Sequence, residues 1–429
     1  MSTRFVWLPA VLLLLALGLI MGCGSHASLS SLTTGVILVT SQGVLNTHGT
    51  PGVILAFTLD LSNGHIAQVN TFTATPGLPT DILVDPAGTF AYVAVTQVST
   101  FAKQTSNAIG TFKINSDGTV SAIGQQGLRP ITEKGGAKIP LVPVALAMDS
   151  AGKFLFVADQ ANALTSSPPP PAGVSGAISV FSIGSNAALA EIPGSPFAVP
   201  VAAGSTYSNP VALAVSPTIL PAGSPQAAPT KEFLYVTDSV GNQVWEFQVD
   251  KSSGALGNPQ GLTSPPGFTT GSTPAGVTVD PFARFVYVAN QVSNDVSAYA
   301  ICNGISPSCL QADGTLVQAG SNAAAGINPV TLAVDPSGGF LFVVDQGSGQ
   351  LSTYRINQAS GAITALSPRD VAVGVQPTSV AIRSDDSWIF VTNQGSSSLS
   401  GFHLIPATGT LGPLNPITTS AAPFGVAVK

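Results

Sequence analysis

Short apolar segments separated by turns recur along this chain, and residues 328–363 show the repeating unit most plainly. The stretch reads NPVTLAVDPSGGFLFVVDQGSGQLSTYRINQASGAI. It contains an apolar run, a Pro/Gly turn, a second apolar run, a polar turn, a third run of alternating character and a Gly turn. Short runs bounded by turn residues are typical of β-strands. The stretch therefore predicts three antiparallel strands and the start of a fourth.

The same unit recurs along the chain, and a proline precedes its first strand, called strand a. The anchors are Pro79, Pro143, Pro210, Pro274, Pro329, Pro377 and Pro423. Strand b follows as a nearly continuous apolar run, which is typical of a strand buried on both faces. Strand c carries an aromatic residue at one position of every unit: Phe57, Phe112, Phe181, Phe247, Tyr299, Tyr354 and Phe402. A Gly turn usually opens strand d, so each unit is a four-stranded meander.

The two ends of the chain predict how the units join. Residues 36–41 match strand b and have no strand a before them, whereas the run after Pro423 matches strand a and has nothing after it. Together they complete one sheet, and a closed ring leaves no exposed strand edge. We predict an all-β fold over residues 35–429. It is a seven-bladed β-propeller of four-stranded antiparallel blades, closed by the C-terminal strand joining the N-terminal blade.

The early units carry insertions, most of them between strands b and c or between strand d and the next strand a. In an up-and-down blade these two connections leave the sheet on one common side, called here the loop-rich face. We expect any ligand surface to lie on this face.

The N-terminus resembles a secretory signal. Arg4 is followed by an apolar run over residues 5–21 and then by Gly22 and Cys23. A basic residue, an apolar core and a small residue before the cleavage point are the features of such signals. The sequence around Cys23 resembles a bacterial lipobox, whose cysteine is lipidated. We predict a signal peptide over 1–22, a tether over 23–34 and an exported protein held in the cell envelope by lipid on Cys23. An uncleaved anchor helix is the alternative.

The two remaining cysteines, Cys302 and Cys309, flank a Gly/Pro/Ser loop. In an oxidising compartment such spacing predicts a local disulfide. A metal site would need more thiols or histidines nearby. We predict no metal and no cofactor, and the chain has no c-type haem motif.

Charge is scarce in this chain. Only 8% of its residues are charged, its formal net charge is −6 and its pI is near 5.0. Nucleic-acid binding requires a concentrated basic patch, so we expect no nucleic acid as a partner. The expected partners are a membrane, through the lipid, and a carbohydrate, peptide or protein ligand. We expect a monomer.

The repeated units, PxxxAVDPxGxFLYVxNQ followed by VSxYxI and a Gly turn, resemble the YVTN-type β-propellers. They also resemble the seven-bladed lactonase family, relatives of bacterial 6-phosphogluconolactonase. The resemblance covers about residues 35–429 and implies the propeller fold. It also implies a few charged groups, His, Arg and Glu, at one mouth of the central channel. The residues of this chain that could serve in that way are His48, Arg129 and Glu133.

A polar pair ends strand b in most units. The predicted ligand-binding residues are these pairs and two neighbours: Gln42, Asp81, Gln97, Asp159, Gln160, Asp238, Asn290, Gln291, Asp345, Gln346, Asn393 and Gln394. By the symmetry of the fold they should form a ring on the loop-rich face, with Asp81 at the channel mouth. The alternative for each Asp and Asn is that it caps the turn between strands b and c.

These observations favour a binding or scaffold module over an enzyme. Neutral amide side chains suit a sugar or peptide ligand, and catalytic candidates are few. The alternative is a lactonase that hydrolyses a lactone at the channel mouth with His48, Arg129 and Glu133.

Overall fold

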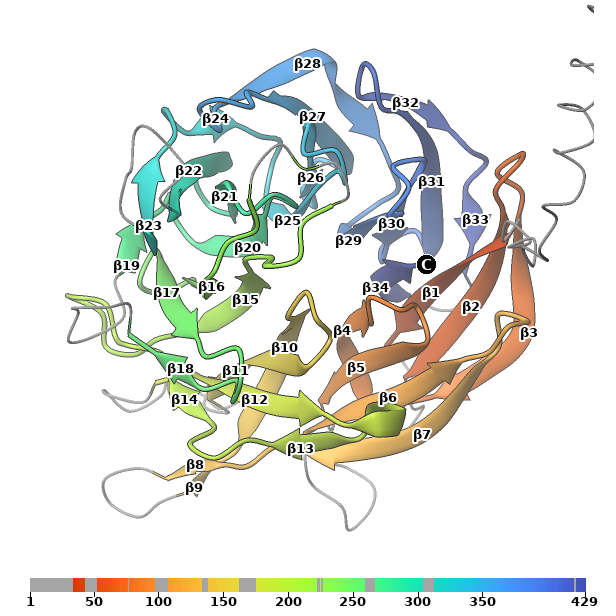
Figure 1. Cartoon of the computed structure of the whole chain (residues 1–429). Helices are drawn as coiled ribbons and strands as arrows, with labels where there is room; N and C mark the ends of the chain where they lie inside the picture. The colour runs from red at the N-terminus through yellow and green to blue at the C-terminus, as the bar shows by residue number, and fades with distance from the viewer. Residues whose placement is uncertain are drawn as a thin grey trace, which may run out of the picture.

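The computed structural model is a ring of antiparallel sheets around a central axis (Figure 1). It describes residues 34–42, 52–75, 77–96, 107–132, 138–161, 175–221, 224, 227–258, 267–303, 312–419 and 422–429. The predicted signal peptide, the lipidation site Cys23 and nearly all of the tether lie outside these residues and stay predictions. Among the described residues, no helix is long and apolar enough to cross a bilayer.

The sheets follow the chain in order, except at the closure. Blade 1 combines the C-terminal strand with the first three: β34 (Pro423–Val428), β1 (Thr34–Ser41), β2 (Val53–Asp60) and β3 (Ile66–Ala74). Blade 2 contains β4 (Leu78–Val84), β5 (Phe90–Thr96), β6 (Ala108–Ile114) and β7 (Val120–Gly127). A separate hairpin, β8 (Ile131–Thr132) and β9 (Lys138–Ile139), follows at the outer rim (Figure 1).

Blades 3 and 4 are each formed from five strands. Blade 3 contains β10 (Leu141–Met148), β11 (Phe154–Ala161), β12 (Ala177–Ile183), the 3-10 helix η1 (Ser185–Ala187), β13 (Leu189–Glu191) and β14 (Phe197–Ala198). Blade 4 contains β15 (Pro210–Val215), β16 (Glu232–Asp238), β17 (Gln243–Val249), β18 (Leu256–Gly257) and β19 (Gly267–Thr269).

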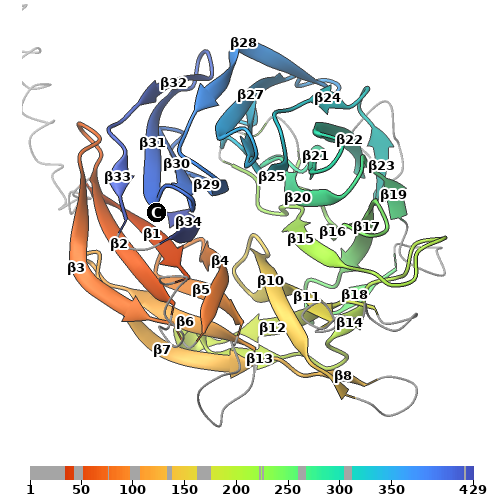
Figure 2. The same cartoon turned by 180° about the vertical axis from the view of Figure 1, so that it is seen from behind.

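The last three blades complete the ring, as the view from behind also shows (Figure 2). Blade 5 contains β20 (Pro274–Val279), β21 (Phe285–Asn290), β22 (Asp295–Asn303), β23 (Ala312–Gln318) and β24 (Ala323–Ala324). Blade 6 contains β25 (Pro329–Val334), β26 (Phe340–Asp345), β27 (Gln350–Ile356) and β28 (Ile363–Ala372). Blade 7 contains β29 (Pro377–Ile382), β30 (Trp388–Asn393), β31 (Ser398–Ile405), β32 (Thr410–Pro413) and β33 (Ile417–Thr418).

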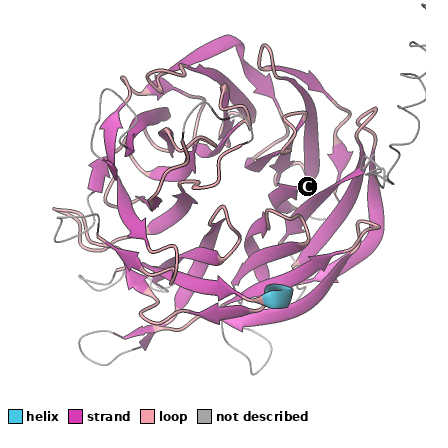
Figure 3. Ribbon diagram, viewed as in Figure 1, coloured by secondary structure: helices cyan, strands magenta, loops and turns pink. Residues whose placement is uncertain are grey.

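The predicted seven-bladed propeller is confirmed, including its closure. The C-terminal strand β34 pairs antiparallel with β1, with Val39 opposite Val426 and Leu38 opposite Ala427. The described chain is almost entirely strand and loop (Figure 3). One detail differs from the prediction of a single strand d. In blades 3, 4, 5 and 7 two short strands share the outer edge, and both pair with strand c.

The core lies between blades rather than within them. Buried side chains form seven clusters, each joining two neighbouring blades around the ring. The strand c aromatic belongs to these clusters, and in every blade it is no more than 4% exposed. The prediction that this repeated aromatic packs between sheets is confirmed.

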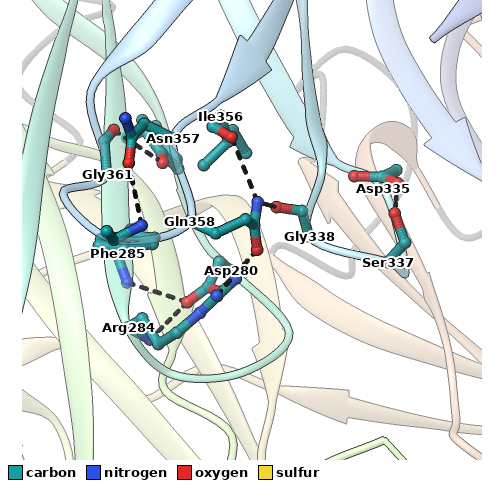
Figure 4. A network of polar contacts seen from close by, with 12 residues as sticks. Asp280, Arg284, Phe285, Asp335, Ser337, Gly338, Ile356, Asn357, Gln358 and Gly361 are labelled. Carbon is teal, nitrogen blue, oxygen red and sulfur yellow. Dashed lines mark hydrogen bonds and ion pairs between the residues drawn. The ribbon is translucent and has the colours of Figure 1, made fainter. Parts of the chain in front are cut away.

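The side opposite the loop-rich face carries tight turns between strands a and b. In blades 2, 3, 5 and 6 an aspartate accepts backbone N–H bonds within this turn; the four are Asp85, Asp149, Asp280 and Asp335. A second network joins blades 5 and 6 on this side (Figure 4). Arg284 pairs with Asp280 and donates to Gln358, and Gln358 donates to the carbonyl oxygen of Gly338 at 2.6 Å.

Blade 7 departs from this turn pattern at Asp386. One position of this turn has a left-handed backbone, and in blades 2, 3 and 6 it is a glycine: Gly88, Gly152 or Gly338. In blade 7 the same position is Asp386, with φ 64°. Asp386 is 8% exposed, and its carboxyl lies beside buried Asp335 of blade 6. Burial first, and then the neighbouring Asp335 carboxylate, raise the pKa of Asp386 to about 6.

Deleting residues 423–429 should open the ring. The deletion exposes the edge of β1 and removes the buried side chains of Val426 and Ala427. We expect loss of the cooperative thermal transition, followed by circular dichroism, and aggregation in light scattering. Lys429→Ala keeps strand β34 and serves as the control, with a nearly unchanged midpoint. A deletion variant that melts like the full chain would show that closure by β34 does not hold the ring.

Asp386→Gly should stabilise the protein, most strongly above pH 6. The folded-state pKa of Asp386 is raised above its unfolded value of 3.8. The folded state therefore binds the proton more tightly, and stability decreases as pH rises through about 6. The glycine variant lacks this decrease and also loses about 1 kcal/mol of left-handed backbone strain. Chemical denaturation at pH 4 and pH 8 measures both effects.

Asp386→Asn separates the two contributions, because it removes the charge and keeps the side chain. Asp386→Asn should show most of the pH-dependent gain in unfolding free energy that we expect for Asp386→Gly. Equal unfolding free energies for the wild type and Asp386→Gly at pH 8 would contradict this interpretation.

Candidate functional site

Each innermost strand begins with a β-bulge on the loop-rich face. Proline has no N–H to give to the ladder, so it is tolerated at the first residue of a strand or at a bulge. In blades 2 to 7 the register shifts between the anchor proline and the second residue after it, as between Pro79 and Asp81. Blade 1 has the same irregularity opposite Pro423. The bulges therefore surround the channel mouth and set the direction of the residues beside it.

Asp81 occupies the bulge of blade 2. The equivalent residues of the other blades are Ala145, Ala212, Gly276, Thr331, Ser379 and Gly425, none of them charged. The Asp81 side chain is half-buried, and its two oxygens accept the N–H groups of Ile82 and of Leu146 in blade 3, each at 2.8 Å. Burial raises the pKa of Asp81 to about 6 despite these two bonds. A carboxyl group with this pKa can exchange a proton near neutral pH.

Two predicted glutamines lie together near this bulge. Gln394 of blade 7 donates to the amide oxygen of Gln42 at 3.4 Å, and Gln42 of blade 1 donates to the carbonyl oxygen of Pro79 at 3.0 Å. Both side chains are half-buried. The structure thus brings Gln394, Gln42 and the start of the Asp81 bulge into one chain of hydrogen bonds across blades 7, 1 and 2.

The Asp and Asn residues predicted as ligands at the ends of strand b lie inside the blades and not on the surface of the loop-rich face. Asp159, Asp238, Asn290, Asp345 and Asn393 are all 0% exposed. Four of them bond the side chain seven residues later on strand c, which is Trp245, Ser297, Ser352 or Ser400. Asp159 instead accepts the Ser179 N–H, and burial raises the pKa of Asp159 to about 8.

Several of these residues also hold the loop that leads to the next strand. Asp238 accepts the N–H groups of Asn209, Val240 and Gly241, and Asn393 accepts that of Gly374. These side chains therefore cap turns and loops, which is the alternative that the sequence left open.

The remaining candidates are dispersed or lie outside the described residues. Arg129 forms a 2.6 Å ion pair with Glu191, on the outermost strand of blade 3, and therefore lies at the outer rim. His48, Gln97, Glu133 and Cys309 lie outside the described residues. Cys302 is buried and disulfide-bonded. In the part of the chain that the structure describes, no three His, Cys, Asp or Glu residues gather as a metal site would require.

A cavity of about 550 Å³ opens on the loop-rich face between blades 6 and 7. The turn after β26 at 346–349, the loop at 373–376, Asn328 and Ser396 line it. Gln346 was predicted as a ligand residue, whereas Asn328 and Gln376 were not. Both directly precede an anchor proline and have a left-handed backbone, with φ 54° and 49°. Their position just before the repeated proline was the sequence signal that could have identified them.

The family model "Lactonase, 7-bladed beta-propeller" matches residues 225–376, from blade 4 to blade 6. The 6-phosphogluconolactonases of Pectobacterium carotovorum and Pectobacterium atrosepticum are 25% and 24% identical to this chain over 140 residues, or 32% of it. The chain spans only 40% of the length of either relative in these matches. The periplasmic gluconolactonase of Pseudomonas aeruginosa has a similar fold, with a TM-score of 0.66. It is 18% identical and the match covers 92% of this chain and 99% of that one.

Our prediction of a binding or scaffold module is wrong in the light of these matches. Both curated relatives bear the name 6-phosphogluconolactonase, which favours the alternative.

Asp238→Ala should destabilise the protein strongly, because it leaves three backbone N–H groups without their buried acceptor. We expect a loss of about 3 kcal/mol of unfolding free energy, measured by urea titration. Gln160→Ala alters the half-buried glutamine of blade 3 and should change it by less than about 0.5 kcal/mol. Similar losses for the two variants would contradict the distinction between structural Asp and surface Gln.

The sequence resemblance and the structure thus agree on a seven-bladed β-propeller, within which residues 225–376 match the lactonase propeller family model.

Proposed function

We propose that this protein is a lactonase that hydrolyses a lactone at the channel mouth of the loop-rich face, with Asp81 as the general base. The names of the relatives support the reaction class. The observation that carries the proposal is the single, half-buried carboxyl among the seven bulges, with a pKa raised to about 6.

The chemistry requires a base, a water molecule and donors for the developing oxyanion. The Asp81 carboxylate takes a proton from water as the water oxygen attacks the lactone carbonyl carbon. The tetrahedral intermediate then collapses, the ring C–O bond breaks and the leaving ring oxygen receives the proton from Asp81. The products are a hydroxy acid and the regenerated carboxylate, so atoms and charge balance.

Two features around Asp81 fit this role. The N–H groups of Ile82 and Leu146 fix the carboxyl orientation, each through one oxygen. The amide groups of Gln42 and Gln394 are nearby donors, and each NH₂ has a second hydrogen beyond the bond already described. Such preorganised donors stabilise the charge that develops on the carbonyl oxygen.

Asp81→Asn should lower kcat/KM at least about 100-fold, within the range that general-base catalysis contributes. The amide oxygen can still accept one of the two N–H bonds, so we expect a folded protein with a cooperative melting transition. Wild-type kcat/KM, corrected for spontaneous ring opening, should increase with pH through a midpoint of about 6 and then level off. The measurement is pH-stat titration on a panel of lactones.

Arg129→Ala is the matched control, because Arg129 lies at the outer rim and should not affect turnover. A wild-type rate that Asp81→Asn leaves unchanged, or one that shows no midpoint near pH 6, would assign the base to another residue.

A further inference from the structure

The cavity between blades 6 and 7 presents unused hydrogen-bonding groups. In the described part of the chain, the side-chain amides of Asn328, Gln346 and Gln376 make no hydrogen bond, and all three border the cavity. Each amide offers two donors and an acceptor. Asn328 and Gln376 are exposed and Gln346 is half-buried. A ligand with several hydroxyl groups matches such a mixture of donors and acceptors.

Apolar side chains provide the other part of the cavity. Val373 and Val375 line it, and Val375 is 61% exposed. Ile327, 58% exposed, lies beside Gly347 of the lining turn. Exposed aliphatic residues next to free amides suit a molecule with both C–H and hydroxyl surfaces.

The cavity has an uncharged lining. None of its lining residues is charged. Asp345, at the base of the lining turn, is buried and bonds Ser352. Moving an anionic group out of water without a cation to pair with it is unfavourable, and a carboxylate nearby increases that cost.

Hydrogen bonds connect this cavity to the proposed base. The N–H of Gln394 donates to the carbonyl oxygen of Gln376 at 3.0 Å. Gln394 in turn bonds Gln42, and Gln42 bonds Pro79 at the bulge of Asp81. Hydrogen bonds across blades 7 and 1 therefore join the lining of the cavity to the bulge that carries Asp81.

We propose that this cavity binds the hydroxylated part of an unphosphorylated lactone, away from its reacting carbonyl, and selects against a phosphorylated one. The proposal rests on the proposed lactonase function and names its substrate class. It differs from what the name 6-phosphogluconolactonase states for the two Pectobacterium relatives.

Binding and turnover test it separately. The binding probe is D-glucono-1,5-lactam, a neutral analogue with an amide in place of the ester, compared with its 6-phosphate by calorimetry on the full chain. We expect the phosphate to bind at least tenfold more weakly. Gln346→Ala and Gln376→Ala should each weaken lactam binding about five- to tenfold, the effect of one lost neutral hydrogen bond. Gln160→Ala, an equivalent glutamine outside the cavity, should leave binding unchanged.

Turnover gives the second readout. In the hydrolysis of D-glucono-1,5-lactone, Gln346→Ala and Gln376→Ala should raise KM about five- to tenfold and change kcat little, because they remove binding and not the base. Lactam binding without lactone hydrolysis would overturn the proposed function and leave the cavity assignment standing. Hydrolysis that prefers the 6-phosphate, equal binding by the cavity variants, or no lactam binding would overturn the cavity assignment.

Discussion

The contact between a glycine and an aromatic ring at five of the seven blade boundaries sets how closely the sheets approach there. The glycine lies in the turn between strands c and d and has a positive φ, and the ring belongs to the first or second residue of strand b in the preceding blade. A Cβ atom on these glycines would come within 2.5 Å of the ring. The pairs are Gly254 with Phe154, Gly314 with Phe233, Gly361 with Phe285, Gly409 with Phe340 and Gly64 with Trp388.

The same contact occurs where the ring closes. The pair Gly64 and Trp388 joins blade 7 to blade 1, so the geometry found at four internal boundaries also holds at the closure. Tyr235 and Tyr287 reinforce two boundaries by donating to the carbonyl oxygens of Gly314 and Gly361. With the spacing fixed in this way, the strand a bulges meet around one channel mouth, where Asp81 lies.

The architecture was predictable because each of its causes is local and repeated. Three of these causes are visible as repeated residue types: proline at the start of strand a, an aromatic residue in strand c and, in most blades, glycine in the c–d turn. The mouth was predictable only in part. The repeat positions predicted three residues that lie at or beside one bulge: Asp81, Gln42 and Gln394. At similar positions, however, Asp238 and Asn393 turn inward and hold loops.

The sequence could not show which polar side chains at the strand ends lie at the channel mouth and which turn inward. That depends on which loop packs over each strand end. The ion pair of Arg129 with Glu191 and the cavity at Asn328 and Gln376 likewise depend on contacts between neighbouring blades. Left-handed backbone occurs at Thr273, Asn328 and Gln376, just before the prolines of blades 5 to 7. The repeat marks these positions in the sequence, but it does not predict their backbone conformation. Such strain is frequent at functional sites.

The most direct test is the rate at which D-glucono-1,5-lactone opens in the presence of the purified protein. The lactonase assignment predicts ring opening faster than in buffer alone, in proportion to protein concentration and saturable with lactone. A rate equal to the spontaneous one, for this lactone and for its 6-phosphate, would contradict it.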